Sequence, residues 1–262
     1  MKDIEVKAYV KKRYGEIADA DTACCCGASP CCTPSTTEVA LRIGYTAADL
    51  QAIPEAASMG LGCGNPVALA GLRAGDTVLD LGSGGGIDVF LAAQRVGPTG
   101  RIIGVDMTEA MVAKAQALAA EHGYTNVEFK LGEIEALPID DASIDVIISN
   151  CVINLSPDKE QVFREAYRVL KPTGRLLVSD LVTEGELPED VKQSFAAWAC
   201  CIGGALDKQA YLATIRRAGF PHVRIVAEST YDIDVTDALK SKITSVHVEA
   251  MKTVALQQIN AR

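Results

Sequence analysis

The sequence is short of basic residues and has no long apolar run. It contains 25 Lys and Arg against 34 Asp and Glu, which gives a formal net charge of -9 at pH 7. Proteins hold nucleic-acid phosphates with clustered basic residues, so this balance argues against a nucleic-acid partner. No stretch approaches the roughly 18 apolar residues of a membrane-spanning helix, and the N-terminus is charged where a signal peptide is apolar. We therefore expect a cytoplasmic protein without membrane association.

Histidine is scarce, whereas cysteine is frequent. His122, His222 and His247 show no Cys/His ligand spacing and no partner for a catalytic dyad. Because a reducing compartment disfavours a static disulfide framework, frequent cysteine indicates metal binding, thiol chemistry or redox cycling. The nine cysteines lie at positions 24, 25, 26, 31, 32, 63, 151, 200 and 201.

From residue 77 onward, short apolar segments alternate with segments of helical periodicity. Such alternation is typical of βαβ units, and the right-handed crossover rule favours a doubly wound parallel sheet. We predict strands at 77–81, 101–105, 127–131, 144–149 and 175–179, with helices at 87–96, 109–122 and 159–170.

The regions on either side of this alternation have a different pattern. Residues 1–65 contain helical stretches near 5–14 and 46–57 around a cysteine-rich segment, and we interpret them as a cap on the central domain, 66–182. Residues 183–262 predict a C-terminal α+β lid, with helices at 188–201 and 208–218, an edge strand at 223–228 and a polar helix from about residue 236. The predicted fold class is α/β, a doubly wound, seven-stranded, Rossmann-like sheet with an N-terminal cap and this lid.

A glycine-rich loop follows the first predicted strand and precedes a helix. Its glycines are Gly82, Gly84, Gly85 and Gly86, and backbone N–H groups in such a loop are free to meet a polar or anionic group. Ile87 stands where a dinucleotide-binding fingerprint has its third glycine, so the loop is not a pyrophosphate site. A tight turn without a ligand is the alternative interpretation.

Acidic residues follow the second and third predicted strands. Asp106 ends the second strand, where a carboxylate accepts hydrogen bonds from ribose hydroxyls; the alternative is an ordinary surface Asp. After the third strand, Gly132, Glu133 and Ile134 place a carboxylate and a backbone N–H at the height expected for an adenine edge. These features predict a nucleoside-containing cofactor.

Four ordered motifs make the resemblance specific. Residues 80–86, 105–108, 132–138 and 169–174 resemble those of class I S-adenosylmethionine-dependent methyltransferases, and the similarity covers about residues 70–180. The resemblance implies that S-adenosylmethionine is the cofactor. It implies that Asp80, Gly82 and Gly84 flank its methionine end and that Asp106 holds the ribose, while Glu133 and the Ile134 amide bind the adenine. The remaining cofactor-binding residues that we expect are Ser83, Met107, Gly132 and Asn150.

The fourth predicted strand ends at Cys151, at the sheet edge where open α/β proteins bind their ligands. A base-methylating enzyme would show an Asn-Pro-Pro-Tyr type loop here, but the chain has Asn150 followed by Cys151. We expect Asn150 to position either the donor's amino-acid end or the acceptor loop; bonding only its own backbone is the alternative. Cys63 lies between two glycines, and Cys201 ends a predicted helix. Cys63 or Cys201 alone is more often a small buried apolar residue than a ligand, but together with Cys151 they suggest three thiolates converging on one soft atom.

The segments around these cysteines, together with the cofactor motifs, resemble those of the arsenite methyltransferases, and the similarity spans nearly the whole chain. The matching segments are 62–64, 80–88, 105–108, 149–155, 165–174, 179–180 and 201–206. The resemblance implies that Cys63, Cys151 and Cys201 bind trivalent arsenic and leave its lone pair facing the methyl group. It implies arsenite, and also methylarsenite, as the methyl acceptor in arsenic detoxification.

An N-terminal cysteine of the family aligns loosely with Cys24, Cys25 or Cys26, and Leu61 replaces a tyrosine common in eukaryotic members. The resemblance implies that this cysteine relays arsenic to the inner site or forms a transient disulfide with it, and that thioredoxin or glutathione, as thiol reductant, restores the enzyme. The alternative for 24–32 is an adventitious metal-binding or disordered loop.

We expect a monomer. The competing functions are methylation of a small organic acceptor, quinone-like or sterol-like, and thiol-based metalloid binding without catalysis.

Overall fold

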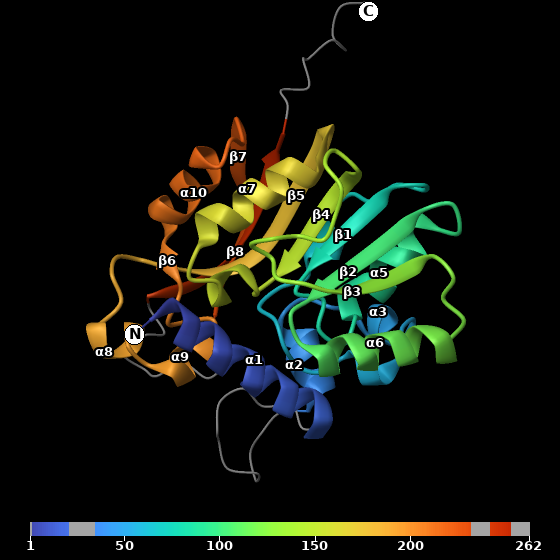
Figure 1. Cartoon of the computed structure of the whole chain (residues 1–262), viewed down its shortest axis with the longest axis horizontal. Helices are drawn as coiled ribbons and strands as arrows, with labels where there is room; N and C mark the ends of the chain where they lie inside the picture. The colour runs from blue at the N-terminus through green and yellow to red at the C-terminus, as the bar shows by residue number, and fades with distance from the viewer. Residues whose placement is uncertain (1, 21–34, 232–241, 253–262) are drawn as a thin grey trace, which may run out of the picture.

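The computed structural model describes residues 2–20, 35–231 and 242–252. Its centre is one mixed sheet in the order β3-β2-β1-β4-β5-β8-β7, with the short β6 paired to β5 outside this path (Figure 1). The strands are β1 Thr77–Leu81, β2 Arg101–Asp106, β3 Val127–Leu131, β4 Ile144–Asn150, β5 Leu170–Thr183, β6 Leu206–Asp207, β7 His222–Thr230 and β8 Ile243–Met251.

Helices connect the strands and cover the sheet. In the central alternating segment the predicted helices are confirmed to within one residue, as α5, α6 and α7. The helix predicted at 188–201 is two short helices instead, and two helices before the sheet were not predicted. The helices are α1 Asp3–Ala20, α2 Thr36–Arg42, α3 Ala47–Gln51, η1 Glu55–Ala57, α4 Pro66–Leu69, α5 Ile87–Val96, α6 Glu109–Glu121, η2 Ile153–Leu155, α7 Lys159–Val169, α8 Glu189–Lys192, α9 Phe195–Ala199 and α10 Lys208–Arg217.

Strands β1 to β5 pair in parallel, as the sequence predicts, whereas β8 runs antiparallel between β5 and β7. The prediction of a C-terminal helix from residue 236 is therefore wrong over Ile243–Met251. In this segment β-branched and apolar residues alternate with polar ones, and Val246, Val248 and Ala250 are buried, which is the two-residue period of a strand. Strands β7 and β8 share the sheet with the central strands, and the boundaries predicted at residues 65 and 182 stay predictions.

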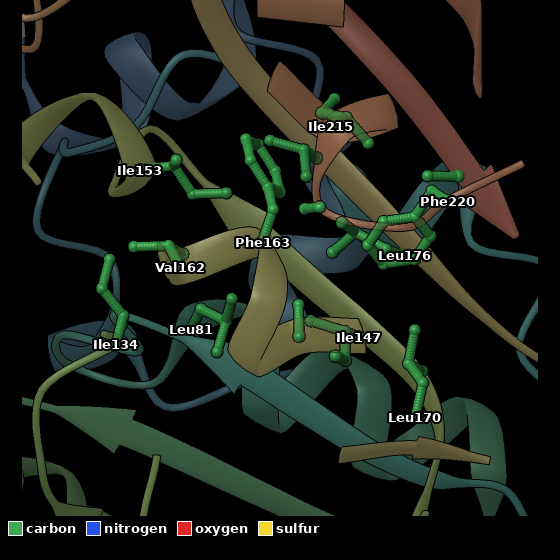
Figure 2. Close-up of a cluster of buried hydrophobic side chains, with 14 of the residues drawn as sticks. Leu81, Ile134, Ile147, Ile153, Val162, Phe163, Leu170, Leu176, Ile215 and Phe220 are labelled. Atoms are coloured by element: carbon green, nitrogen blue, oxygen red, sulfur yellow. The ribbon is translucent and has the colours of Figure 1, made fainter. Parts of the chain in front are cut away.

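The sheet has a separate hydrophobic core on each face. One core joins Leu81 and Ile147 of the sheet to Phe163 of α7 and Ile215 of α10 (Figure 2). The other core packs α5 and α6 against the opposite face. Because both faces are covered by helices, the doubly wound arrangement predicted from the sequence is confirmed. No helix in the described part of the chain is both long and apolar enough to span a membrane.

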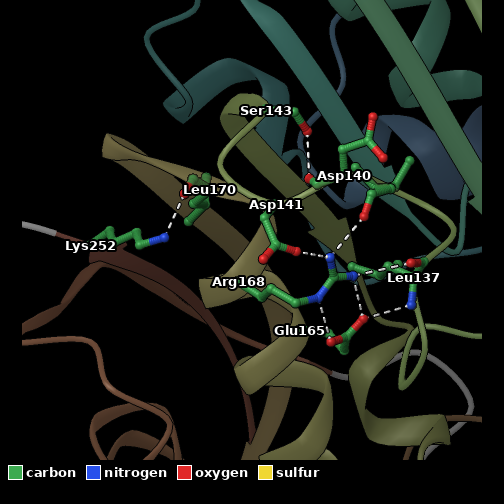
Figure 3. Close-up of polar contacts among 9 residues, drawn as sticks. Leu137, Asp140, Asp141, Ser143, Glu165, Arg168, Leu170 and Lys252 are labelled. Carbon is green, nitrogen blue, oxygen red and sulfur yellow. Dashed lines mark hydrogen bonds and ion pairs between the residues drawn. The ribbon is translucent and has the colours of Figure 1, made fainter.

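Arg168 of α7 fixes the loop that leads from β3 to β4. Its guanidinium donates to the carbonyls of Leu137 and Ile139 and pairs with Asp141 and Glu165 (Figure 3). Glu165 in turn accepts the N–H of Leu137 at 2.8 Å. Because the backbone of this loop is held at the Leu137 N–H and at the carbonyls of Leu137 and Ile139, the loop keeps a defined shape. The residues that precede Leu137 in the same loop are therefore also held in place.

Candidate active site

A cavity opens at the carboxyl ends of β1, β2 and β4, the edge where doubly wound proteins bind their ligands. The cavity is partly open to solvent. Most of the predicted cofactor residues line it, namely Asp80, Gly82, Ser83, Gly84, Asp106, Met107, Ile134 and Asn150, together with Cys151.

The glycine loop forms the floor of this cavity. Gly82, Gly84 and Gly86 have φ values of 65°, 50° and 94°, which L side chains rarely adopt. A Cβ on Gly82 would lie 2.3 Å from Val152, whereas one on Gly84 would point into open space. The buried Ser83 hydroxyl has no hydrogen-bond partner within the described residues. A loop that has no room for a side chain at Gly82 and that offers an unpartnered Ser83 hydroxyl is suited to bind a cofactor.

Asp106 holds the loop in this shape. Its two carboxylate oxygens accept the N–H groups of Gly84 and Thr108, both at 2.9 Å. Burial raises the pKa of Asp106, and burial with the nearby charges of Asp88 and Asp106 raises that of Asp80 well above its usual value. Three buried carboxyl groups beside one cavity favour a cationic ligand. S-Adenosylmethionine, which carries a sulfonium and an ammonium group, has this chemistry.

The predicted adenine residues are only partly brought together. Ile134 lines the cavity, but Glu133 points outward, with a side chain 57% exposed and paired to Lys7 of α1. Glu135, two residues later, lines the cavity in addition and also pairs with Lys7. Gly132 lies outside the lining; its N–H donates to the Asp106 carbonyl. Which acidic residue of this loop faces the ligand depends on its three-dimensional path, which the sequence does not reveal.

Helix α1 crosses the cavity mouth and ties its two sides together. Lys7, Val10 and Tyr14 of this helix line the cavity. On the lid side, the Tyr14 hydroxyl donates to the carbonyl of Ala199 in α9, at 3.2 Å. Lys11 pairs with Glu109 of α6 on the other side. The N-terminal segment therefore contributes directly to the cavity wall.

The three cysteines predicted as ligands meet beside this cavity. Cys63, Cys151 and Cys201 are buried free thiols that come from the cap, the end of β4 and the segment after α9. The thiol of Cys63 donates to the Ser179 carbonyl, and that of Cys201 donates to the Cys151 carbonyl. Cys151 lines the cavity directly. Cys200, the sequence neighbour of Cys201, does not belong to the group, since it is disulfide-bonded, although the sequence argued against a static disulfide framework.

The backbone holds two of these cysteines in an unusual conformation. Cys151 and Cys201 have φ values of 61° and 63°, and only one other described non-glycine residue, Ala142, has a positive φ. Left-handed conformations cost a non-glycine residue roughly 1–2 kcal/mol, and in folded proteins they concentrate at functional sites. Burial raises the pKa of Cys63 to about 11. The hydrogen bond with Cys151 and burial raise that of Cys201 well above its usual value, so the thiols are protonated at neutral pH.

Asn150 connects the cavity to the Cys63 loop. Its Oδ1 accepts the N–H of Cys63 at 3.0 Å, and its Nδ2 donates to the Gly64 carbonyl at 2.7 Å and to the Tyr45 hydroxyl at 2.9 Å. A Cβ on Gly62 would lie 2.9 Å from the same amide. Of the roles expected from the sequence, these contacts favour positioning of the acceptor loop.

Asn150→Ala is expected to lower methyl transfer by about 10- to 100-fold, because loss of the amide releases Cys63 from its position. S-Adenosylmethionine affinity, measured by calorimetry, should change by less than about threefold. Asn126→Ala is the matched control, since its amide donates to the Gly97 carbonyl at 3.0 Å, away from the cavity lining. A fall in cofactor affinity as large as the fall in rate would instead assign Asn150 to the donor.

A buried polar group behind the thiols was not predicted from the sequence. Asp180 of β5 is fully buried, and one of its carboxylate oxygens lies with the sulfur atoms of Cys63 and Cys151 within 4.8 Å of one another. Tyr211 donates its hydroxyl to the Oδ2 atom of Asp180 at 2.8 Å. Burial raises the pKa of Asp180 to about 7, whereas the Tyr211 hydrogen bond and the positive charge of the buried Lys159 lower it. The signal in the sequence was its place in the matching segment 179–180, directly after the predicted strand 175–179.

Comparison with known proteins agrees with the geometry. Residues 72–219 match a family model described as a methyltransferase domain. An arsenite methyltransferase of Halobacterium salinarum is 44% identical over 261 residues, covering 95% of this chain and 67% of the relative. The chain belongs to the arsenite methyltransferase family. The Mus musculus arsenite methyltransferase is 38% identical over 247 residues, 88% of this chain and 62% of that protein.

A solved structure of the same family supports the fold assignment. The crystal structure of an arsenic(III) S-adenosylmethionine methyltransferase from Chlamydomonas reinhardtii matches with a TM-score of 0.68 and 33% identity. The match covers 86% of this chain and 76% of the other. The chain spans about two thirds of the length of the arsenite methyltransferases from Halobacterium and mouse. It is thus an S-adenosylmethionine-dependent methyltransferase, with the Rossmann-like fold of this class.

Proposed function

We propose that this chain transfers a methyl group from S-adenosylmethionine to arsenite bound by Cys63, Cys151 and Cys201. The observation that carries the proposal is the meeting of three free, buried thiols beside the cavity that the predicted cofactor residues line. The thiols come from segments far apart in the chain, and thiolates are the preferred ligands of thiophilic centres. The names of the relatives and the crystal structure of the algal enzyme support arsenic as the acceptor.

The high pKa values of the thiols suit arsenite as the ligand. Each thiol that replaces a hydroxyl of arsenite gives its proton to that hydroxyl, which leaves as water. The three-sulfur adduct is neutral, so it can sit in a buried site without the cost of burying separate charges. By contrast, a free thiolate at Cys63 is disfavoured, because burial raises the pKa of its thiol to about 11.

The remaining chain positions the two reactants. Bound S-adenosylmethionine supplies a methyl group on a sulfonium centre. Asp80 and Asp106 place two carboxyl groups on the cavity wall, and Asp106 also fixes the glycine loop. Helix α1 covers the cavity mouth, where it limits the access of water. Asn150 holds the Cys63 loop against the cavity, so the acceptor is oriented toward the donor.

The proposal also covers a second acceptor, the biological role, the reductant, the oligomeric state and the location in the cell. We include methylarsenite as a second acceptor, arsenic detoxification as the role, and thioredoxin or glutathione as the thiol reductant. A monomer in the cytoplasm is also part of the proposal. The relay cysteine, Cys24, Cys25 or Cys26, lies outside the described residues and is proposed on the family resemblance alone.

Asp106→Ala is expected to weaken S-adenosylmethionine binding by about 10- to 100-fold, through loss of charge-assisted hydrogen bonds of roughly 1.5–3 kcal/mol. Calorimetry with the cofactor measures the effect. Asp145→Ala is the matched control, because Asp145 also accepts a backbone N–H, from Thr77, but outside the cavity lining. Undiminished affinity in the Asp106 variant would remove this residue from the cofactor site.

The function itself is tested by methyl transfer from labelled S-adenosylmethionine. The purified chain is incubated with a thiol reductant and, in parallel, with arsenite, a quinone precursor, a sterol precursor or no acceptor. The proposal predicts labelled methylarsenic species only in the arsenite reaction. Label in an organic acceptor but not in arsenic would support the small-molecule methyltransferase alternative. Tight arsenite binding without label transfer would indicate a metalloid-binding protein.

A further inference from the structure

Asp180 has a place in the site that cofactor and arsenic binding leave unexplained. It follows Ser179, whose carbonyl accepts the Cys63 thiol, and its side chain is fully buried. One carboxylate oxygen lies with the sulfur atoms of Cys63 and Cys151 within 4.8 Å of one another. Three thiols already complete the ligand set of trivalent arsenic. The carboxylate is therefore next to the acceptor without being needed to hold it.

The surroundings keep this carboxylate in place. Tyr211 donates to Oδ2 at 2.8 Å, and the Leu181 N–H donates to Oδ1 at 3.3 Å. Lys159, whose ammonium donates to the Asn154 and Ser156 carbonyls, supplies a buried positive charge that acts on Asp180. A buried charge costs several kcal/mol unless it is compensated, and an apolar side chain would fill the space at lower cost. These contacts hold an acidic side chain beside the acceptor, where a negative charge can act on it.

We propose that Asp180 is a catalytic residue that stabilises the positive charge appearing on arsenic during methyl transfer. This inference rests on the proposed function. In the step, the arsenic lone pair forms a bond to the methyl carbon, and the carbon–sulfur bond of the sulfonium breaks with its electron pair remaining on sulfur. Arsenic is formally oxidised from the trivalent to the pentavalent state. S-Adenosylhomocysteine leaves neutral at its sulfur, and the positive charge has moved to arsenic.

The position of Asp180 makes its effect larger in the transition state than in the ground state. Before transfer the positive charge is on the donor, in the cavity, whose lining includes Cys151 but not Asp180. During transfer the charge moves toward the atom that Cys63 and Cys151 hold, and therefore toward the carboxylate. Only an interaction that strengthens along this path accelerates the reaction. A negative charge about 5 Å from a half-developed positive charge, at the effective dielectric of a protein, accelerates the step by about 10- to 30-fold.

The test is Asp180→Asn, which keeps the size of the side chain and removes its charge. Single-turnover transfer from labelled S-adenosylmethionine is measured at saturating arsenite and compared with the unmodified chain. We expect the rate to fall by about 10- to 30-fold. Arsenite affinity, followed by the fluorescence of Trp198, and cofactor affinity should stay within about twofold. Trp198 is the only tryptophan of the chain and lies three residues before Cys201.

Several results would overturn the inference. One is an unchanged single-turnover rate; another is a slower rate that weaker arsenite binding explains fully, since a structural role predicts that result. Should Asp180→Asn fail to fold, Asp180→Ser, which leaves room for water, is measured in the same way with the same expected loss. Failure of the proposed function looks different, because the unmodified chain would then transfer no methyl group to arsenite at all.

Discussion

Cys63→Ser, Cys151→Ser and Cys201→Ser should each lower arsenite methylation by at least about 100-fold, a loss of roughly 2.7 kcal/mol in transition-state stabilisation. Serine keeps the size of the side chain but replaces a soft sulfur donor with a hard oxygen, which suits arsenic poorly. The remaining two sulfurs then hold arsenic with its lone pair tilted away from the methyl group. The rate of labelled methyl transfer measures the effect, and calorimetry should show cofactor affinity unchanged.

The three serine variants need not lose methylarsenite turnover to the same extent. A methylated arsenic has fewer positions left for sulfur, so one of the three serine variants should retain methylarsenite turnover. The cysteine that can be spared is the outermost ligand. Full arsenite methylation by all three variants would contradict the three-thiolate site and favour an organic acceptor.

Gly204→Ala should both destabilise the protein and impair catalysis. A Cβ at this position would lie 2.0 Å from the carbonyl oxygen of Asn154 and 2.7 Å from the Trp198 ring, so the segment that carries Cys201 must move. Overpacking of this kind costs typically about 1–3 kcal/mol, which corresponds to a fall in Tm of about 3 to 10 °C. Because Cys201 is displaced with the segment, we expect methyl transfer to fall by at least about tenfold.

Gly15→Ala is the control for this substitution. Gly15 lies within α1, and its added Cβ would be 3.7 Å from the Thr108 methyl group, an ordinary contact. Alanine is also the better helix former, so stability should hold or rise slightly. Equal losses in both variants would show that the tight packing around Gly204 does not position Cys201.

The parts that the sequence predicted well depend on local patterns. Alternating apolar and helical segments predicted strand β1 and helix α5 at their observed bounds, because both elements pack their apolar residues in the expected way. The three cysteines were predicted from their glycine-rich or strand-end contexts and from the family resemblance. Their meeting beside the cavity is a tertiary property, and the structure brings them together.

The parts that were missed depend on contacts between distant segments. Asp180 and Lys159 are far apart in the sequence, and their common environment arises only when α7 packs near the end of β5. The outward orientation of the Glu133 side chain depends on its ion pair with Lys7, which lies in α1 near the N-terminus. Strand β8 was predicted as a helix although it alternates apolar and polar residues, and it forms by pairing with β5 and β7, which the local sequence does not show.

X-ray absorption at the arsenic edge, with arsenite bound to the purified chain, tests the central claim most directly. The method counts the sulfur and oxygen neighbours of arsenic without depending on turnover. The three-thiolate site predicts three sulfur neighbours and no oxygen, and two sulfurs in each single serine variant. Two sulfurs and one oxygen in the unmodified chain would contradict it.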